Sequence, residues 1–246
     1  MSNTPWHILT LPRTPYLEAW RLQHRLLAAR QAGLIPDTLV LVEHPHVYTL
    51  GRKAVPEHLL FSAAELAERG VETYWVDRGG DITYHGPGQI VGYVICDLRQ
   101  RGLDAHGYLR AVEEVLLQAL AAYGIAGRRD PEYTGMWVAD EKVGAIGVRV
   151  SRGVSMHGFA LNLNPDLSLF DGIVPCGIRD RGVTSLARVL GDAPETEAVR
   201  VVLMTALQRV FGGEARRVTL EQALADAPDV PQPVSDPPTR YARTLI

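Results

Sequence analysis

Residues 134–163 read TGMWVADEKVGAIGVRVSRGVSMHGFALNL, and this stretch decides the fold class. Its β-rich runs fall at 134–138, 143–150 and 156–163, and short polar turns separate them. Such spacing is typical of consecutive antiparallel strands. Strands gathered in clusters, with helices between the clusters, predict an α+β chain and not a regular βαβ alternation.

The apolar spacing predicts further elements on both sides of this stretch. Strands are expected at 6–11, 38–43, 73–76 and 90–98, and helices at 15–32, 63–69, 109–123, 185–190 and 197–210. The sequence has no internal repeat and no low-complexity linker in its middle, which favours one domain. Beyond Leu224 the chain is rich in Pro and Asp, a composition typical of an extended tail. We therefore expect one folded domain at 1–225 and a Pro-rich C-terminal tail at 226–246.

The composition is that of an ordinary globular protein and argues against several classes of function. The 246 residues are 46% hydrophobic and 22% charged, which supplies a sizeable core. A formal net charge of -3 gives no basic footprint for nucleic acid. No apolar run approaches the roughly 20 residues of a membrane span, and the N-terminus lacks the pattern of a signal peptide. We therefore expect a cytoplasmic protein that binds neither nucleic acid nor membrane.

The segment 78–89, RGGDITYHGPGQ, packs Arg78, Thr83, His85 and Gln89 among glycines. Glycines let the backbone approach a ligand closely and expose N–H donors to it. The segment matches neither the nucleotide-binding pattern GxxxxGK[ST] nor the dinucleotide pattern GxGxxG. The residues alone leave two interpretations open, a flexible turn and a ligand-binding loop.

Lys142 lies in an Asp-Glu-Lys turn, where a lysine is usually solvated. The residues that follow it, Gly144-Ala-Ile-Gly147, are less ordinary. Small residues along a strand create a trough in which another chain, such as an alkyl tail, can lie. This pattern indicates an apolar slot beside the lysine.

The chain has two cysteines, too few for a disulfide framework. Cys96 lies in the apolar run Gly-Tyr-Val-Ile-Cys-Asp-Leu and has the character of a small buried hydrophobe. Cys176 lies between a proline and a glycine, where no regular strand or helix would bury it, so the character of a small buried hydrophobe fits it poorly. His44 and His46 lack matching acidic or cysteine ligands, so we expect a structural role for them and no metal site.

Several spaced blocks together resemble the lipoyl(octanoyl) transferase family. They are Arg78-Gly-Gly…Thr-Tyr-His-Gly-Pro-Gly-Gln89, Lys142…Ala-Ile-Gly147, His157-Gly-Phe-Ala-Leu-Asn162, and Pro175-Cys-Gly-Ile178 with Val183-Thr-Ser-Leu186. The upstream run 43–51 also resembles the family. The resemblance implies a fold similar to the catalytic domain of biotin and lipoate protein ligases, a single α/β domain with mixed sheets, which would make residues 1–225 an octanoyltransferase catalytic domain.

The same resemblance implies roles for individual residues. Cys176 would be the acyl-thioester nucleophile and Lys142 its activating partner, and no cofactor is implied. The residues implied to bind substrate are Arg78, Gly79, Gly80, Asp81, Ile82, Thr83, Tyr84, His85, Ala145, Ile146, Gly147, Gly158, Phe159 and Ala160. The family takes octanoyl from octanoyl-acyl carrier protein in lipoate biosynthesis. It attaches the group to a lysine of lipoyl domains of 2-oxoacid dehydrogenase complexes or of the glycine cleavage H protein.

The chemistry of the residues agrees with that role but does not by itself select the partner of the thiol. A free thiol, with a pKa of about 8.5, is only slightly ionised at neutral pH, and a neighbouring cation stabilises the thiolate. Catalytic cysteines more often pair with histidine, so the residues alone would favour His85 or His157, and only the resemblance favours Lys142. A slot lined by Ala145, Ile146, Phe159 and Ala160 would set the chain-length preference by its depth.

Three rival functions remain open at this stage. An ATP-dependent lipoate or biotin protein ligase forms an acyl-adenylate and needs no cysteine nucleophile. An acyl thioesterase would let water attack the same acyl-enzyme. A non-enzymatic acyl-binding protein would hold octanoyl without a covalent adduct.

Overall fold

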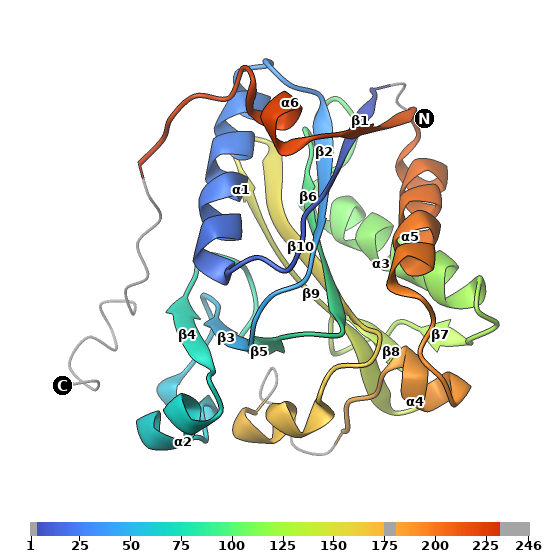
Figure 1. Ribbon diagram of the computed structural model, residues 1–246. Coiled ribbons are helices and arrows are strands. Elements are labelled where there is room, and N and C mark those ends of the chain that lie inside the picture. The colour runs from blue at the N-terminus through green and yellow to red at the C-terminus, as the bar shows by residue number, and fades with distance from the viewer. Residues whose placement is uncertain (1–3, 175–180, 232–246) are drawn as a thin grey trace.

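The computed structural model describes residues 4–174 and 181–231 and contains a large and a small sheet (Figure 1). The large sheet has eight strands in the order β11-β1-β2-β6-β10-β9-β8-β7. Their bounds are β1 Trp6–Thr10, β2 Asp37–Val42, β6 Gln89–Ile95, β7 Gly127–Arg128, β8 Met136–Val138, β9 Glu141–Ser151, β10 Val154–Asn162 and β11 Ala215–Val218. The strands β11, β1 and β2 run parallel, and the remaining pairs are antiparallel.

The small sheet has three strands in the order β4-β3-β5. Their bounds are β3 Val47–Leu50, β4 Glu72–Trp75 and β5 Ile82–His85. The strand β3 pairs parallel with β4 and antiparallel with β5. Both sheets are therefore mixed, as the resemblance to ligase catalytic domains implied, and the predicted α+β class is confirmed.

Helices cover both faces of the large sheet, α1 on one and α3 with α5 on the other (Figure 1). The helices are α1 Tyr16–Gln31, α2 Ala63–Glu68, α3 Ala105–Ala121, α4 Leu186–Leu190, α5 Thr196–Phe211 and α6 Leu220–Leu224, and the 3₁₀ turns are η1 Pro56–His58 and η2 Leu167–Gly172. Side chains of β2 point alternately to the two faces of the large sheet. Leu39 and Leu41 join the core under α3 and α5, whereas Val40 and Val42 join the core under α1.

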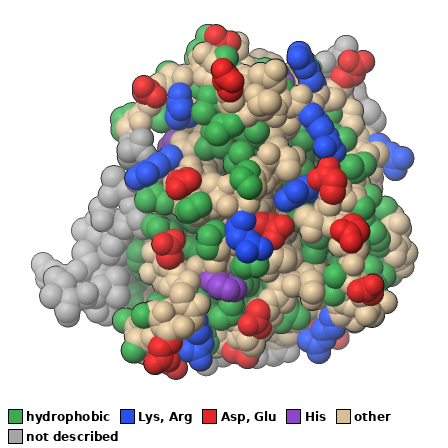
Figure 2. Space-filling view, viewed as in Figure 1, with side chains coloured by type: hydrophobic (Ala, Val, Ile, Leu, Met, Phe, Trp, Pro, Cys, Tyr) green, Lys and Arg blue, Asp and Glu red, His purple; other side chains and the backbone are tan. Residues whose placement is uncertain are grey.

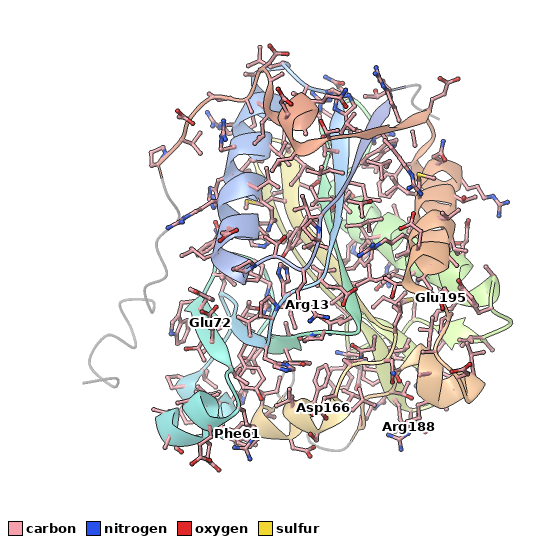
Figure 3. All side chains as sticks on the ribbon, viewed as in Figure 1. Arg13, Phe61, Glu72, Asp166, Arg188 and Glu195 are labelled. Atoms are coloured by element: carbon pink, nitrogen blue, oxygen red, sulfur yellow. The ribbon has the colours of Figure 1, made fainter. Side chains whose placement is uncertain are left out.

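A third core ties the small sheet to the segment that precedes residue 175. Tyr48, Ile82 and Tyr84 pack there against Phe170 and Ile173. At this end of the molecule Phe61 lies beside α2 and Asp166 lies before η2 (Figure 3). The residues just before position 175 are thus part of a packed core.

The predicted triplet of antiparallel strands at 134–163 is confirmed as β8, β9 and β10. Sequence reasoning missed β3, β5 and β11, which are each four residues long. Strands this short carry little periodicity, and they form here because a partner strand supplies their hydrogen bonds. The helix α6, also missed, begins at a capping box between Thr219 and Gln222.

One face of the surface carries charges of both signs. On the face shown in Figure 2, Lys and Arg side chains alternate with Asp and Glu, and no large patch of one charge forms there. None of the helices in the described part of the chain is long and apolar enough to cross a membrane.

Candidate active site

The glycine-rich segment is held in place by backbone hydrogen bonds and is not a loose turn. Gly79 N donates to Val148 O of β9 at 2.9 Å. From the other side Arg52 N donates to Arg78 O at 3.0 Å, and Lys53 N donates to Gly80 O at 2.9 Å. The segment is therefore fixed between the end of β3 and the middle of β9, which leaves its side chains preorganised.

Two glycines, one in β9 and one at the end of β3, let this segment pack closely against its neighbours. A Cβ at Gly147 would lie 3.0 Å from the Arg78 side chain and 3.1 Å from Gly79 O. A Cβ at Gly51 would lie 2.5 Å from Gly80 O. The small residues that predicted a trough in β9 thus also let the backbone of the glycine-rich segment approach closely.

Arg78 brings a buried positive charge to the site. Its side chain is 7% exposed, and Thr49 of β3 accepts its hydrogen bonds at the carbonyl oxygen (2.5 Å) and at Oγ1 (2.9 Å from Nη2). A charge buried at this depth is stable only where such acceptors surround it. Arg78 therefore forms a fixed cationic wall of the site.

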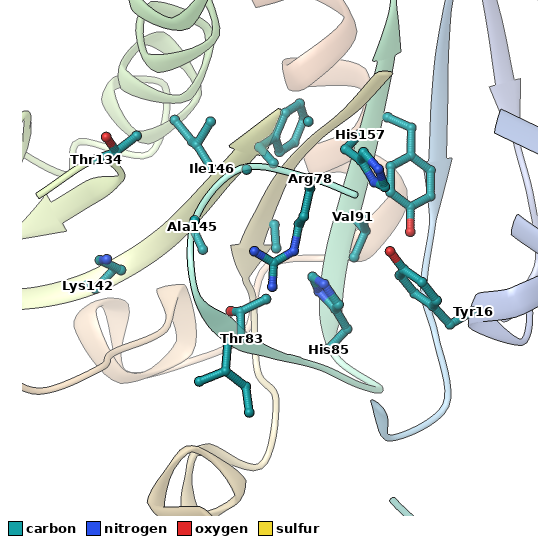
Figure 4. Close-up of a pocket in the computed structure, with 17 residues that line it drawn as sticks. Tyr16, Arg78, Thr83, His85, Val91, Thr134, Lys142, Ala145, Ile146 and His157 are labelled. Carbon is teal, nitrogen blue, oxygen red and sulfur yellow. The ribbon is translucent and has the colours of Figure 1, made fainter. Parts of the chain in front are cut away.

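An apolar slot opens between the glycine-rich segment and the β9–β10 pair (Figure 4). The space not filled by atoms in and around it, which includes open solvent at its mouth, is about 530 Å³. The lining residues are Tyr16, Arg78, Gly80, Ile82, Thr83, His85, Val91, Tyr93, Thr134, Lys142, Ala145, Ile146, Gly147, His157, Gly158, Phe159 and Ala160. Ala145, Ile146, Phe159 and Ala160 give the slot an apolar wall of the kind that an alkyl chain needs, and the polar side chains of Arg78, Thr83 and His85 also line it (Figure 4).

Lys142 lies where this slot meets an outer cleft of about 1020 Å³ and a smaller cavity. Its side chain is only 6% exposed, so the ordinary expectation of a solvated lysine is wrong. Its Nζ lies 4.8 Å from the centroid of the Trp137 ring, a cation–π distance. Figure 4 shows Lys142 and Thr134 at one end of the slot, and Tyr16 and His157 at the other.

The main chain of Lys142 is held from two sides. Trp137 of β8 pairs with it on one side. On the other side Lys142 N donates to Gly182 O at 2.9 Å, and Thr184 N donates to Lys142 O at 3.0 Å. Lys142 is therefore bound directly to the chain that follows residues 175–180.

The two histidines that compete with Lys142 are held uncharged. Burial, helped by nearby His44, lowers the pKa of His85 to about 3, and its Nδ1–H donates to Gln89 Oε1 at 2.8 Å. Burial also lowers the pKa of His157, although the bond from its Nε2 to Asp77 Oδ1 (2.7 Å) acts in the opposite direction. Neither ring is a cation at neutral pH, so neither can stabilise a thiolate by charge.

His157 has a backbone φ of 58°, which only a minority of non-glycine residues adopt. Burial alone would raise the pKa of its partner Asp77. The hydrogen bond to His157, the charge that His157 carries only at the low pH where Asp77 titrates, and the charge of Arg149 lower it to about 2. The strained backbone and this ionised partner fix the ring at the far end of the slot.

The structure brings together most of the residues predicted to bind substrate. Those that line the slot are Arg78, Gly80, Ile82, Thr83, His85, Ala145, Ile146, Gly147, Gly158, Phe159 and Ala160. Gly79 and Asp81 line the outer cleft instead. Tyr84 does not line the slot but packs in the third core, where its hydroxyl bonds His46 Nδ1 at 2.8 Å. Cys176 lies outside the described residues.

Sequence reasoning missed Tyr16, Val91, Tyr93 and Thr134 as slot residues. Tyr16 was assigned only to the apolar face of a helix, and Val91 and Tyr93 only to a buried strand. Tyr16, Val91 and Tyr93 enter the site because α1 and β6 pack beside β10, a long-range arrangement that no local pattern reports, and Thr134 lies just before β8.

Cys96 and His44 have the structural character that their neighbours in sequence indicated. Cys96 is fully buried, and burial, with a smaller effect of Asp37, raises the pKa of its thiol to about 12. His44 Nδ1–H donates to Thr14 O at 2.7 Å, and its Nε2 accepts from the Tyr93 hydroxyl at 2.7 Å. Both ring nitrogens of His44 are therefore occupied by protein groups.

The fold and this slot define a class of protein. The chain belongs to the lipoyl protein ligase A/B catalytic domain family, whose model matches residues 15–208. Solved structures with the same fold include lipoate-protein ligase A bound with ATP (TM-score 0.76, 17% identity, 90% of this chain and 92% of that chain). Another is a bipartite lipoate protein ligase from Thermoplasma acidophilum (TM-score 0.70, 16% identity, 91% and 90%).

Within this family the similar curated proteins are octanoyltransferases. The octanoyltransferase of Rubrobacter xylanophilus is 53% identical over 201 residues, which cover 81% of this chain and 90% of that protein. The octanoyltransferase of Chloroflexus aurantiacus is 51% identical over 209 residues, which cover 84% and 94%. The predicted class, an acyltransferase that moves octanoyl in lipoate biosynthesis, is confirmed by these relatives.

Proposed function

We propose that this enzyme takes octanoyl from octanoyl-acyl carrier protein onto Cys176 and passes it to a lysine of a lipoyl domain, with Lys142 as the partner of the thiol. One observation carries the proposal. Lys142 is buried where the apolar slot meets the outer cleft, and its main chain is bonded to the residues that follow the segment containing Cys176.

The chain on both sides of residues 175–180 is anchored beside the site. Before the segment, Val174 N donates to His58 O at 2.9 Å, and the His58 ring bonds Asp81, which lines the outer cleft. After the segment, Gly182 O accepts from Lys142 N. These two anchors support placing the thiol of Cys176 within reach of the slot and of Lys142.

In the first half-reaction the Cys176 thiolate attacks the thioester carbonyl of the donor. A bond forms between Sγ and the carbonyl carbon, the bond from that carbon to the donor sulfur breaks, and the departing thiolate takes a proton from Lys142. One thioester replaces another, so the step is near thermoneutral and needs no ATP.

In the second half-reaction the neutral ε-amine of the acceptor lysine attacks the acyl-enzyme. The new bond joins its nitrogen to the carbonyl carbon, the bond to Sγ breaks, and the surplus proton of the amine goes to neutral Lys142. This restores the thiolate and the ammonium. Conversion of a thioester to an amide is downhill and drives the transfer.

The slot supports a medium alkyl chain as the group that is moved. Ala145, Ile146, Phe159 and Ala160 give it an apolar wall, and burial contributes about 0.8 kcal/mol per methylene. The alkyl chain would enter the slot from the end where Lys142 lies. The thioester carbonyl would then remain near the outer cleft.

The partners follow from the chemistry of the two half-reactions. The donor is an octanoyl thioester, and we propose that acyl carrier protein presents it at the outer cleft. For the acceptor we propose lipoyl domains of 2-oxoacid dehydrogenase complexes or of the glycine cleavage H protein. The bipartite ligase of T. acidophilum was studied with its E2 lipoyl domain, which agrees with such an acceptor. We also propose a cytoplasmic location, since a chain with two cysteines and no disulfide framework suits a reducing compartment.

The direct test mixes the enzyme with octanoyl-acyl carrier protein and a purified lipoyl domain, without ATP, and follows the mass of the lipoyl domain. We expect it to gain one octanoyl group, and we expect free octanoate with ATP to give no product. Transfer that requires ATP would instead identify a ligase. Release of free octanoate at an undiminished rate without the acceptor would identify a thioesterase.

A further inference from the structure

We propose that Asn162 is a positioning residue for octanoyl transfer, because it holds the main-chain segment that fixes Lys142. The inference rests on the proposed role of Lys142. Asn162 is the last residue of β10 and is 4% exposed. It lines the small cavity beside Lys142, and no role was assigned to it from the sequence.

The ladder between β10 and β9 ends before it reaches Lys142. Its last pair joins Leu161 to Gly144, two positions short of Lys142. From there the segment 182–184 replaces β10, with Val183 bridged parallel to Lys142. The lysine is therefore aligned by a short segment outside the regular ladder, and that segment needs its own support.

The side chain of Asn162 supplies this support. Its Nδ2 donates to Thr184 O at 2.9 Å, and Thr184 N donates to Lys142 O at 3.0 Å. Thr184 is 1% exposed, so water cannot readily replace the Asn162 amide at its carbonyl. One buried residue thus joins the end of β10 to the main chain of the lysine.

A directional network fixes which way the Asn162 amide faces. His85 Nδ1–H donates to Gln89 Oε1 at 2.8 Å, so the Gln89 NH₂ group faces the other way. That group donates to Asn162 Oδ1 at 2.8 Å. The NH₂ group of Asn162 must then face Thr184 O, and a carboxylate at position 162 would set two acceptors against each other.

The test uses Asn162→Ala and Asn162→Asp in a Cys96→Ser background, so that Cys176 is the one remaining thiol. The exposed neighbour Asn164 gives the matched control, Asn164→Ala. The first readout is the rate of octanoyl transfer, and the second is the pH dependence of thiol alkylation by iodoacetamide. The second readout reports how strongly the Lys142 ammonium stabilises the Cys176 thiolate. A residue with only a structural role would not change it.

We expect both Asn162 variants to lose roughly 10- to 100-fold in kcat, with a smaller change in KM, because misplacement of a reacting group is costly. We expect their alkylation profiles to move to higher pH, toward the profile of Lys142→Ala. In the Lys142→Ala background, Asn162→Ala should cause no further shift, since the two changes act through one group. Asn164→Ala should behave like the parent.

The inference is overturned if the Asn162 variants keep the parent alkylation profile, or if their shift adds fully to that of Lys142→Ala. If neither variant folds, as judged by thermal unfolding, Asn162→Ser gives the same readouts, because its shorter side chain cannot span the gap to Thr184 O. A Lys142→Ala variant with undiminished transfer would instead defeat the proposed function. The two failures are therefore distinguishable.

Discussion

Lys142 is buried, although its neighbours in sequence are typical of a solvated lysine. A lysine in an Asp-Glu-Lys turn is ordinarily solvated, yet here the strand β9 begins at Glu141 and takes Lys142 inside. Its ammonium lies over Trp137, whose ring Arg181 also contacts at 5.2 Å from Cζ to the centroid. The site thus holds its cation on an aromatic wall and not in solvent.

Replacement of Lys142 by Ala should raise the pH at which Cys176 is alkylated, because a neighbouring ammonium stabilises the thiolate. The measurement is the rate of iodoacetamide modification against pH, in a Cys96→Ser background. Lys53→Ala, which removes an exposed cation at the outer cleft, is the control and should leave the profile nearly unchanged. An identical profile for Lys142→Ala would remove Lys142 from its proposed role.

His44 should make the protein less stable in mild acid. Burial lowers its pKa from 6.5 to about 4 in the folded chain, although the backbone bond to Thr14 opposes the shift. As the pH falls from about 6.5 to about 4, the unfolded chain takes up a proton that the folded chain refuses, so the free energy of unfolding decreases.

The check is the urea midpoint at pH 7 and at pH 4.5. We expect the difference between the two midpoints to be smaller in His44→Gln than in the parent protein. His106 is exposed, and His106→Gln should keep the full difference. Equal differences in all three proteins would contradict the assignment of this pH dependence to His44.

The residues themselves predicted some of these roles and not others. The apolar neighbours of Cys96 were enough to predict its burial. The choice between Lys142 and a histidine was beyond the sequence, because it depends on partners that lie far away in the chain. Asp77, which bonds His157, is 80 residues distant from it.

At the scale of elements, the β9–β10 pair serves two functions at once. Its small residues give the slot its width, and they also admit the glycine-rich segment to within hydrogen-bonding distance of Val148. The sequence predicted the slot from these residues. It did not predict β5, because its four residues lie between glycines in a segment whose composition is typical of a loop.

Gly147→Ala should therefore slow octanoyl transfer by roughly 10-fold through displacement of the glycine-rich segment. The added Cβ would lie 3.0 Å from the Arg78 side chain and 3.1 Å from Gly79 O, so the segment must shift. Steady-state kinetics with an octanoyl donor measures the effect. Val150→Ala, at an exposed position of the same strand, should be neutral, and equal rates for both variants would contradict the prediction.

For the whole molecule, the mixed-sheet domain followed from the family resemblance, whereas its C-terminal edge did not follow from any pattern. The strand β11 completes the large sheet against β1, and α6 buries Ala223 in the core under α1. Beyond α6, Arg25 Nη2 donates to Ala227 O at 3.3 Å. We propose that the catalytic domain comprises residues 1–225, and that residues 232–246 of the Pro-rich tail at 226–246 are not needed for activity.

Removal of residues 232–246 should leave the melting temperature and the transfer rate unchanged. Removal of residues 215–246 should lower the melting temperature by about 5–10 °C, because it exposes the edge of β1 and the core contacts of α6. Differential scanning calorimetry of both truncated proteins gives the comparison. A large decrease in melting temperature on removal of residues 232–246 alone would show that these residues are part of the domain.

Intact-mass spectrometry can detect the proposed octanoyl thioester on Cys176. The enzyme is incubated with octanoyl-acyl carrier protein alone, as the parent and as the Cys176→Ser and Cys96→Ser variants. We expect one octanoyl adduct on the parent and on Cys96→Ser, and none on Cys176→Ser. An adduct that persists in Cys176→Ser and disappears in Cys96→Ser would contradict it.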